Sequence, residues 1–446
     1  MEQSDILGIE PIPKLIFRLV PPMMLVFFVQ AMYNIMDSMF IARYDESGLT
    51  ALSIIFPLQL ILLAIATGTG SGINVIAARL LGEGNKSAAE KTAFHGFILG
   101  IINWIATTLI CLIILVPYFK ISTSDALVID AGVSYGKIII ILSFGLYIES
   151  NCTKILQATG NMKIPMLAQS SGAVCNIIFD YLLIFGKAGF PEMGISGAAT
   201  ATVAGQILAM IISFIGVLKN KCLKLRPYKI KIKLFIKIYK AAMPNIIMQS
   251  LYTVYIFGLN LILGTFSSAA VTVLGIYYKL QSFFFIPLFG MEQAILPIIS
   301  YNHGMHNFRR IRAALKYSCL ISVICMGAAA VAFILIPTNL INIFSQNQEI
   351  LSIGKTAFPI IGLSFIPAAV TLLLPVFFQG LSKNFESIFT TVLRQIILFV
   401  PLAWLFSKFG LDFVWLTFPC TETITLLGGV ILLFKDSFFF DNVSRN

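Results

Sequence analysis

Charged residues are scarce in this sequence. Asp, Glu, Lys and Arg make up 11% of the 446 residues, whereas hydrophobic residues make up 58%. Soluble globular proteins carry about 25% charged residues, so this chain lacks the polar side chains that would cover a water-exposed surface. The scarcity argues against an ordinary soluble enzyme or binding domain and indicates a protein that lies in a lipid bilayer.

Motifs for catalysis and for metal binding are also missing. The three histidines and seven cysteines are scattered, and the sequence has no CxxC, HExxH or GxSxG pattern and no Walker-type loop. His303 and His306 have a spacing that a metal could use, but they stand in a loop without converging acids or thiols. Neither hydrolysis nor ATP-driven transport is indicated, and we expect no enzyme activity and no cofactor.

Long apolar runs are abundant instead. Segments such as 98–116, 195–217 and 320–337 hold few charges, and each is long enough to cross a hydrocarbon core of roughly 30 Å as a helix. A β-barrel would show short alternating segments. Hydropathy therefore predicts an all-α membrane protein with twelve transmembrane helices, near residues 15–42, 51–79, 92–116, 130–154, 164–186, 196–218, 235–263, 272–301, 313–336, 354–380, 385–407 and 412–434.

The basic residues favour one set of loops. The formal net charge is +11, and nine Lys and Arg residues with no acid among them lie between Lys219 and Lys240. Because the charges are spread over short loops, they fit the positive-inside rule rather than nucleic-acid binding. We expect a basic cytoplasmic linker at 219–234, both termini in the cytoplasm, and a multi-pass protein of the plasma membrane that contacts lipid and no nucleic acid.

The two halves of the sequence resemble each other. An ungapped shift of 222 residues aligns identical residues, among them Pro22 with Pro244, Tyr33 with Tyr255, Gln59 with Gln281 and Gln157 with Gln379. Two six-helix bundles repeated in one orientation are a layout of transporters in which the bundles rock about a central cavity. We predict two pseudo-symmetric six-helix bundles, an N-terminal lobe at 1–218 and a C-terminal lobe at 235–446.

Eight segments with recognisable motifs are spread along nearly the whole chain. They are YNIMDSMFIARY (33–44), LTALSIIFPL (49–58), ARLLGEGN (78–85), QATGNMKIPM (157–166), CNIIFDYLLIFG (175–186), GISGAATATVAGQ (194–206), GMEQAILPIISYNHG (290–304) and FFQGLSKN (377–384). By their order and spacing they resemble the multidrug and toxic compound extrusion (MATE) family, in its bacterial drug-exporter branch. The resemblance implies a monomer that exports small amphipathic organic cations by alternating access, driven by H⁺ or Na⁺ antiport. The alternative is a flippase for a lipid-linked saccharide or another amphiphile, whose cavity we would expect to hold several cationic residues.

Four polar residues of the N-terminal half are predicted to lie at similar depth. Asp37 is in the first helix, Asn176 and Asp180 are in the fifth, and Thr202 is in the sixth; all fall within roughly 6–15 Å of the outer boundary. Ionisable residues inside a membrane are functional candidates, and these oxygen ligands suit Na⁺ or a shared proton. Asp180 could instead cap a turn or pair locally. In the family that the sequence resembles, the matching residues form the cation and proton site of the N-terminal lobe, which implies ion coupling here and no other metal.

The C-terminal half offers a second candidate site. Glu292 in the eighth helix and Arg394 in the eleventh have matching depths. Either Glu292 binds a substrate cation or a proton directly, or the two residues form a buried ion pair that locks the lobe. Three other charged residues, Lys137, Glu149 and Lys154, are expected to snorkel near helix ends.

Overall fold

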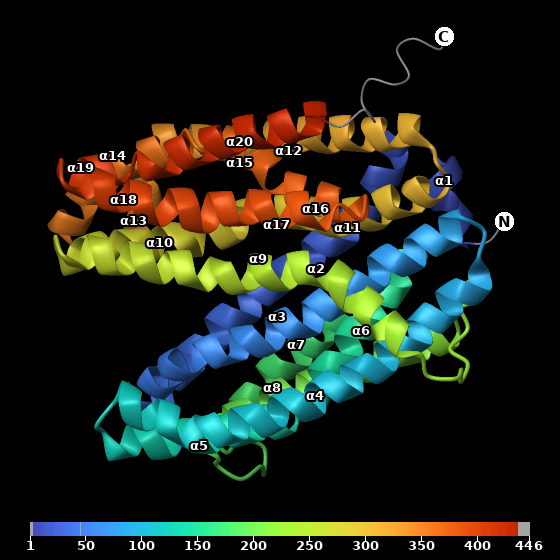
Figure 1. Ribbon diagram of the computed structural model, residues 1–446. Helices are drawn as coiled ribbons and strands as arrows, with labels where there is room; N and C mark the ends of the chain where they lie inside the picture. Colours follow the sequence, from blue (N-terminus) through green and yellow to red (C-terminus); the bar gives the residue numbers. More distant parts are fainter. Residues whose placement is uncertain (1–2, 45, 436–446) are drawn as a thin grey trace. The chain divides into compact units, whose positions relative to one another are not determined.

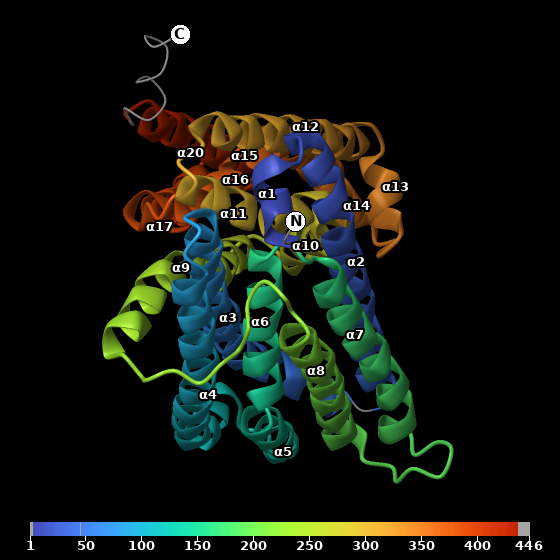
Figure 2. The ribbon, with the colours of Figure 1, turned by 90° about the vertical axis from the view of Figure 1, so that its right-hand side faces the viewer.

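Figures 1 and 2 show a computed structural model, which describes residues 3–44 and 46–435. Within these residues the chain is helical and contains no β-strand. Nine helical segments in the described part of the chain are long and apolar enough to cross a membrane. Three pairs of consecutive helices, each bent at a short break, pass the same test together, and the number is twelve if each pair is one span. The described part of the chain confirms the all-α membrane fold with its twelve predicted spans.

The first six spans run from α2 to α8, after a short 3₁₀ turn at Gln3–Asp5 and the short helix α1 at Ile6–Ile9. Their helices are α2 (Ile12–Tyr44), α3 (Glu46–Gly82), α4 (Lys86–Ser122), α5 (Ala126–Ile141), α6 (Phe144–Ala158), α7 (Lys163–Ile184) and α8 (Gly194–Leu218). The fourth span consists of α5 and α6, which are bent by 44° relative to each other.

The last six spans run from α9 to α20. Their helices are α9 (Ile232–Gly264), α10 (Ser268–Phe284), α11 (Ile286–Gly304), α12 (Phe308–Leu335), α13 (Pro337–Asn342), α14 (Gln348–Gly362), α15 (Phe365–Thr371), α16 (Leu373–Gly380), α17 (Asn384–Val392), α18 (Phe399–Ser407), α19 (Leu411–Val414) and α20 (Thr417–Lys435). A π-helical turn, Leu393–Leu398, joins α17 to α18. The eighth span bends by 53° between α10 and α11, and the tenth bends by 49° between α14 and α15.

The broken spans follow the internal repeat. The fourth span covers residues 126–158 and the tenth covers 348–380, so both ends differ by 222 residues (348 − 126 and 380 − 158), and both spans are bent in the middle. The break in the eighth span has a local cause, because Pro287 stands in the first turn of α11 and proline has no N–H to continue a helical hydrogen-bond ladder. Hydropathy predicted these spans without their breaks.

Contacts between residues divide the described chain into two compact units. The first comprises the residues up to Glu10 together with Pro21–Ile246, and the second comprises Pro11–Val20 together with the residues from Ile247 onward. The predicted lobe limits at residues 218 and 235 stay a prediction, because these units are defined by contacts and not by membrane spans.

Helices α7 and α8 of the first unit lie side by side and approach closely (Figure 1). A Cβ atom added to Gly172 on α7 would lie 2.6 Å from the carbonyl oxygen of Gly205 on α8. Small residues permit such close backbone contact between membrane helices. Asn176 lies one turn after Gly172, and Thr202 lies about one turn before Gly205, so the glycine pair sets the distance at which these two side chains meet.

The segment between α8 and α9 carries six of the nine basic residues from Lys219 to Lys240, and it runs along the start of α4 (Figure 2). Glu90 on α4 accepts a hydrogen bond of 2.9 Å from the Tyr228 hydroxyl. Five residues later on α4, His95 Nε2 accepts a hydrogen bond of 2.9 Å from the backbone nitrogen of Lys231. These contacts hold the linker on the first unit.

Candidate functional site

The four residues predicted to couple ions all lie in the first unit. Asp37 is on α2, Asn176 and Asp180 are on α7, and Thr202 is on α8. Asp180 is fully buried and Asn176 is 3% exposed, while Asp37 and Thr202 are half-buried. Asn176 and Asp180 are four residues apart and therefore share one face of α7.

Hydrogen bonds join three of these residues. With its amide oriented so that donors face acceptors, Asn176 donates to Asp180 Oδ2 at 3.1 Å. Its amide oxygen then accepts from the backbone nitrogen of Thr202 at 3.2 Å and from the Thr202 hydroxyl at 3.3 Å. Asp180 does pair locally with Asn176, as the alternative reading of the sequence allowed, but this bond occupies one carboxylate oxygen.

The two carboxylates keep oxygen atoms without donors. Asp37 Oδ1 and Asp180 Oδ1 are buried and accept no hydrogen bond within the described residues. The two carboxylates are close enough for their charges to interact, and among the described residues neither forms an ion pair with Lys or Arg. Because buried charge without a partner is costly, a proton or another cation would stabilise this arrangement.

Three residues that the sequence analysis did not propose for the site lie around these acids. The hydroxyls of Tyr33 on α2 and Tyr135 on α5 are within reach of the charges of both Asp37 and Asp180. Gln59 on α3 donates from Nε2 to the Tyr135 hydroxyl at 3.1 Å. The internal repeat contained a signal for two of them, because Tyr33 and Gln59 are residues that recur at the 222-residue shift.

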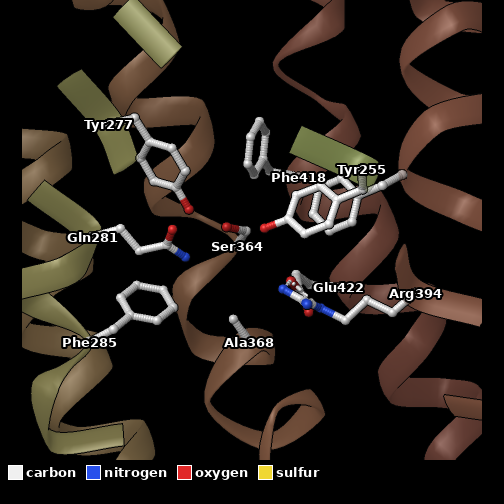
Figure 3. Close-up of a pocket in the computed structure, with 10 residues that line it drawn as sticks. Tyr255, Tyr277, Gln281, Phe285, Ser364, Ala368, Arg394, Phe418 and Glu422 are labelled. Carbon is white, nitrogen blue, oxygen red and sulfur yellow. Dashed lines mark hydrogen bonds and ion pairs between the residues drawn. The ribbon is translucent and has the colours of Figure 1, made fainter. Parts of the chain in front are cut away.

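The second unit contains a polar cavity (Figure 3). The hydroxyls of Tyr255 and Tyr277 and the amide of Gln281 point into it, and Arg394 and Glu422 meet at its wall. The space open to the centre of a water-sized sphere is about 10 Å³, which is about the room of one water molecule. This cavity therefore takes no drug-sized molecule in the conformation described.

Arg394 pairs with Glu422 of α20 and not with Glu292. Its Nε and Nη2 donate to Glu422 Oε1 at 2.9 and 2.6 Å, and Thr371 donates to the other carboxylate oxygen. The predicted pair of Glu292 and Arg394 is wrong, because equal depth gives a position along the membrane normal but not the direction of a helix face. Glu292 is half-buried on α11, and its role as a direct binding site stays a prediction.

The π-helical turn places Arg394 in its pocket. Such turns insert a residue into a helix and are frequent at functional sites, and Arg394 is the second residue of this one. Its guanidinium carbon lies 5.3 Å from the centre of the Phe399 ring, and Phe399 in turn stacks on Tyr255 with ring centres 4.8 Å apart. The cation is thus held by both a carboxylate and an aromatic face.

Two of the residues expected to snorkel are buried instead. Glu149 and Lys154 on α6 are each 8% exposed, whereas Lys137 on α5 is exposed as expected. The expectation fails because α6 is surrounded by other helices of the first unit: it packs against α3, α4 and α8, and Figure 2 shows it between α4 and α8. Charged side chains on such a helix have no route to the membrane surface along its side.

Comparison with known proteins decides the family. A family model described as MatE matches the chain twice, at residues 22–182 and 244–405. The chain belongs to the MatE family. The second MatE match begins 222 residues after the first (244 − 22), which confirms the internal repeat. The MatE resemblance seen in the sequence motifs is therefore also confirmed, and the chain is a multi-pass membrane transporter.

Relatives and solved structures agree with the MatE assignment over most of their length. The chain is 25% identical to a probable multidrug resistance protein NorM of Thermotoga maritima, over 79% of this chain and 76% of that protein. It is 23% identical to an FAD transporter of Shewanella oneidensis, over 93% of this chain and 92% of that protein. A multidrug resistance MATE transporter in an outward-facing conformation has the same fold, with a TM-score of 0.90 and 22% identity over 96% of both chains.

Proposed function

We propose that this MatE protein is a secondary active exporter of amphipathic organic cations that exchanges them for H⁺ or Na⁺ across the plasma membrane. The observation that carries the proposal is the pair of uncompensated acids, Asp37 and Asp180, inside the first unit. Membership of a transporter family supports the transport step, and the name of the NorM relative supports multidrug cargo.

Ion binding at these acids drives the exchange through differential affinity. A cation or proton that enters the site satisfies carboxylate oxygens that have no donor, and it reduces the negative charge that attracts a cationic substrate. Substrate affinity should therefore fall when the ion binds, and by reciprocity ion affinity should fall when substrate binds. Alternating access turns this competition into export, because the ion binds on one side of the membrane and the substrate on the other.

The charges inside the two units favour a cationic cargo over an anionic one. A flippase for a lipid-linked saccharide, or a carrier for a dinucleotide such as the cargo named for the Shewanella relative, would need uncompensated cations to bind phosphate. Arg394, the basic residue of the cavity in the second unit, is neutralised by Glu422. In the first unit the groups left without partners at the candidate site are acids.

A competition assay tests the cargo class. Purified protein in proteoliposomes should transport the fluorescent cation ethidium, and excess tetraphenylphosphonium should inhibit this transport while excess FAD should not. Equal inhibition by FAD would contradict the cationic class and favour an anionic cargo. Empty liposomes under the same gradient give the background rate.

Orientation is a further part of the proposal. The segment from Lys219 to Lys240 should face the cytoplasm, where its nine basic residues lie against anionic headgroups. A cysteine at Arg226, which is exposed, should react with a membrane-impermeant maleimide only after cells are permeabilised. A cysteine at the exposed Glu192 between α7 and α8 should react in intact cells. The reverse pattern would contradict this orientation.

A further inference from the structure

His95 on α4 is a buried titratable residue that the proposed exchange of ions and substrate does not use. Its side chain is 1% exposed, and it lies against the α8–α9 segment, residues 219–231. The ring centres of Phe94 and Phe235 are 5.7 and 5.4 Å from that of the imidazole. Because water has little access to this position, the polar atoms of the imidazole depend on the protein for their hydrogen bonds.

The partners of the two ring nitrogens determine the protonation state of His95. Nδ1 lies 2.7 Å from the carbonyl oxygen of Lys91, four residues earlier on α4. A carbonyl oxygen only accepts hydrogen bonds, so Nδ1 carries a hydrogen. Nε2 accepts from the backbone nitrogen of Lys231 at 2.9 Å, so Nε2 carries none. Both bonds together require the neutral imidazole, in the tautomer that is protonated at Nδ1.

From this geometry we infer a pH-sensitive latch, in which neutral His95 binds the end of the α8–α9 segment to α4 and protonated His95 releases it. Protonation places a hydrogen on Nε2, which then faces the N–H of Lys231, and two donors cannot form a hydrogen bond. Histidine is the side chain that ordinarily changes its charge between about pH 5 and 8. The latch therefore opens as the pH falls in the compartment that the segment faces, which is the cytoplasm in the proposed orientation.

Other titratable groups surround the latch. Glu90 accepts from the backbone nitrogen of Lys224 at 3.2 Å and from the Tyr228 hydroxyl at 2.9 Å, and a carboxyl group can accept such bonds in either protonation state. Loss of hydration and the bonded Glu90 raise the pKa of Tyr228 above its ordinary value, so this hydroxyl keeps its proton. Of these three bonded groups, only His95 has a contact that depends on its charge.

The charge around His95 favours opening once the imidazole is protonated. The elements around it carry Lys91 of α4, the six basic residues of the α8–α9 segment, Arg79 of α3, Glu149 and Lys154 of α6, and Lys233 and Lys237 of α9. Basic residues outnumber acidic ones in this set. A charged imidazole is therefore repelled by the same segment that it binds when neutral.

Opening of the latch acts on the start of α9. Lys231 directly precedes this helix, whose residues belong to the first unit up to Ile246 and to the second from Ile247 onward. Tyr239 on α9 donates to Asn103 on α4, so opening frees the segment and the first turns of α9 without detaching the helix. A helix that belongs to both units transmits the rocking of the bundles less well when its start is loose. We expect slower transport with the latch open, and this expectation, unlike the latch, rests on the proposed function.

Hydrogen–deuterium exchange of the full-length protein in detergent tests the latch. From about pH 8 to about pH 6 the Lys231 amide should lose protection, by up to roughly tenfold for each pH unit below the titration of the histidine. The Cys222 amide is the internal reference, because it donates to Asn220 Oδ1 at 2.8 Å and an amide oxygen does not titrate. The ratio of the two exchange rates cancels the effect of pH on the exchange chemistry. A ratio that does not change with pH would overturn the latch.

The variant His95→Gln assigns the pH dependence to this residue. Glutamine is neutral and offers an oxygen to Lys231 and an N–H donor to Lys91, so Lys231 should stay protected at both pH values. Should glutamine fail to hold the segment, exchange at Lys231 is fast at both, and the lost pH dependence still assigns it to His95. His306→Asn, at an exposed histidine after α11, should keep the wild-type behaviour. Wild-type pH dependence in His95→Gln would overturn the latch.

Transport by proteoliposomes tests the consequence of opening. With the same ion gradient imposed, the rate of ethidium movement by the wild type divided by that of His95→Gln should fall several-fold from about pH 8 to about pH 6. A quotient that does not change with pH would overturn the effect on transport. No movement of ethidium by either protein would contradict the proposed function, and the exchange measurement would still decide whether the latch exists.

Discussion

Replacing either Asp37 or Asp180 by asparagine should abolish gradient-driven efflux while the protein still folds and still binds its substrate. Asparagine keeps the shape of aspartate but removes the charge, so the site no longer attracts a proton or cation. Wild-type substrate affinity should fall as H⁺ or Na⁺ rises, by a factor of about 5–150, the usual range of coupling between two sites. Substrate binding by the purified variants, measured across a series of ion concentrations, should show no such dependence.

The variant Glu192→Gln is the matched control for this experiment. It removes one negative charge from an exposed residue between α7 and α8, on the loop that connects two of the three helices of the candidate site. Its efflux should equal that of the wild type. Full gradient-driven efflux by both Asp37→Asn and Asp180→Asn would place the coupling site elsewhere, and Glu292 would become the first residue to test.

Glu422→Gln should lower the stability of the protein by about 3–5 kcal/mol, because it leaves the buried guanidinium of Arg394 without its counter-charge. Arg394 is 7% exposed and Glu422 is 2% exposed, so water cannot replace the lost partner. Adding Arg394→Gln to the same chain should restore part of the loss, since both charges are then gone. Unfolding of the purified protein by denaturant in detergent measures these differences.

A surface ion pair of the same protein provides the comparison. Arg79 and Glu83 are bonded at 2.9 Å, but their side chains are 39% and 33% exposed. Exposed pairs contribute about 0–1 kcal/mol, so Glu83→Gln should change stability little. A loss for Glu422→Gln no larger than that for Glu83→Gln would contradict a structural role of the buried pair.

Much of the architecture follows from patterns that are visible in one sequence. Apolar runs predicted all twelve spans, because a bilayer imposes a minimum length on every crossing helix. The 222-residue repeat predicted two similar halves, and it also marks Tyr33 and Gln59, whose partners Tyr255 and Gln281 line the cavity of the second unit. Polar residues that recur at the repeat shift thus lie at the candidate site of the first unit and at the cavity of the second.

Features that depend on the direction of a side chain were not predictable in the same way. Equal depth in the membrane predicted that Arg394 pairs with Glu292. The π-helical turn instead places Arg394 against α20, where it forms an ion pair with Glu422. Their positions near helix ends predicted that Glu149 and Lys154 reach the membrane surface, but the packing of α6 against α3, α4 and α8 buries both. Rotation about a helix axis and bending of a span leave little trace in hydropathy.

Efflux from proteoliposomes under imposed gradients tests the central claim most directly. Vesicles containing the purified protein and a fluorescent cation are exposed first to a proton gradient and then to a sodium gradient, each without the other. Ion-coupled antiport predicts that one gradient accelerates movement of the cation and that collapsing this gradient with an ionophore stops it. Movement at the rate of empty vesicles under both gradients would contradict the claim that this protein is an H⁺- or Na⁺-driven exporter of cations.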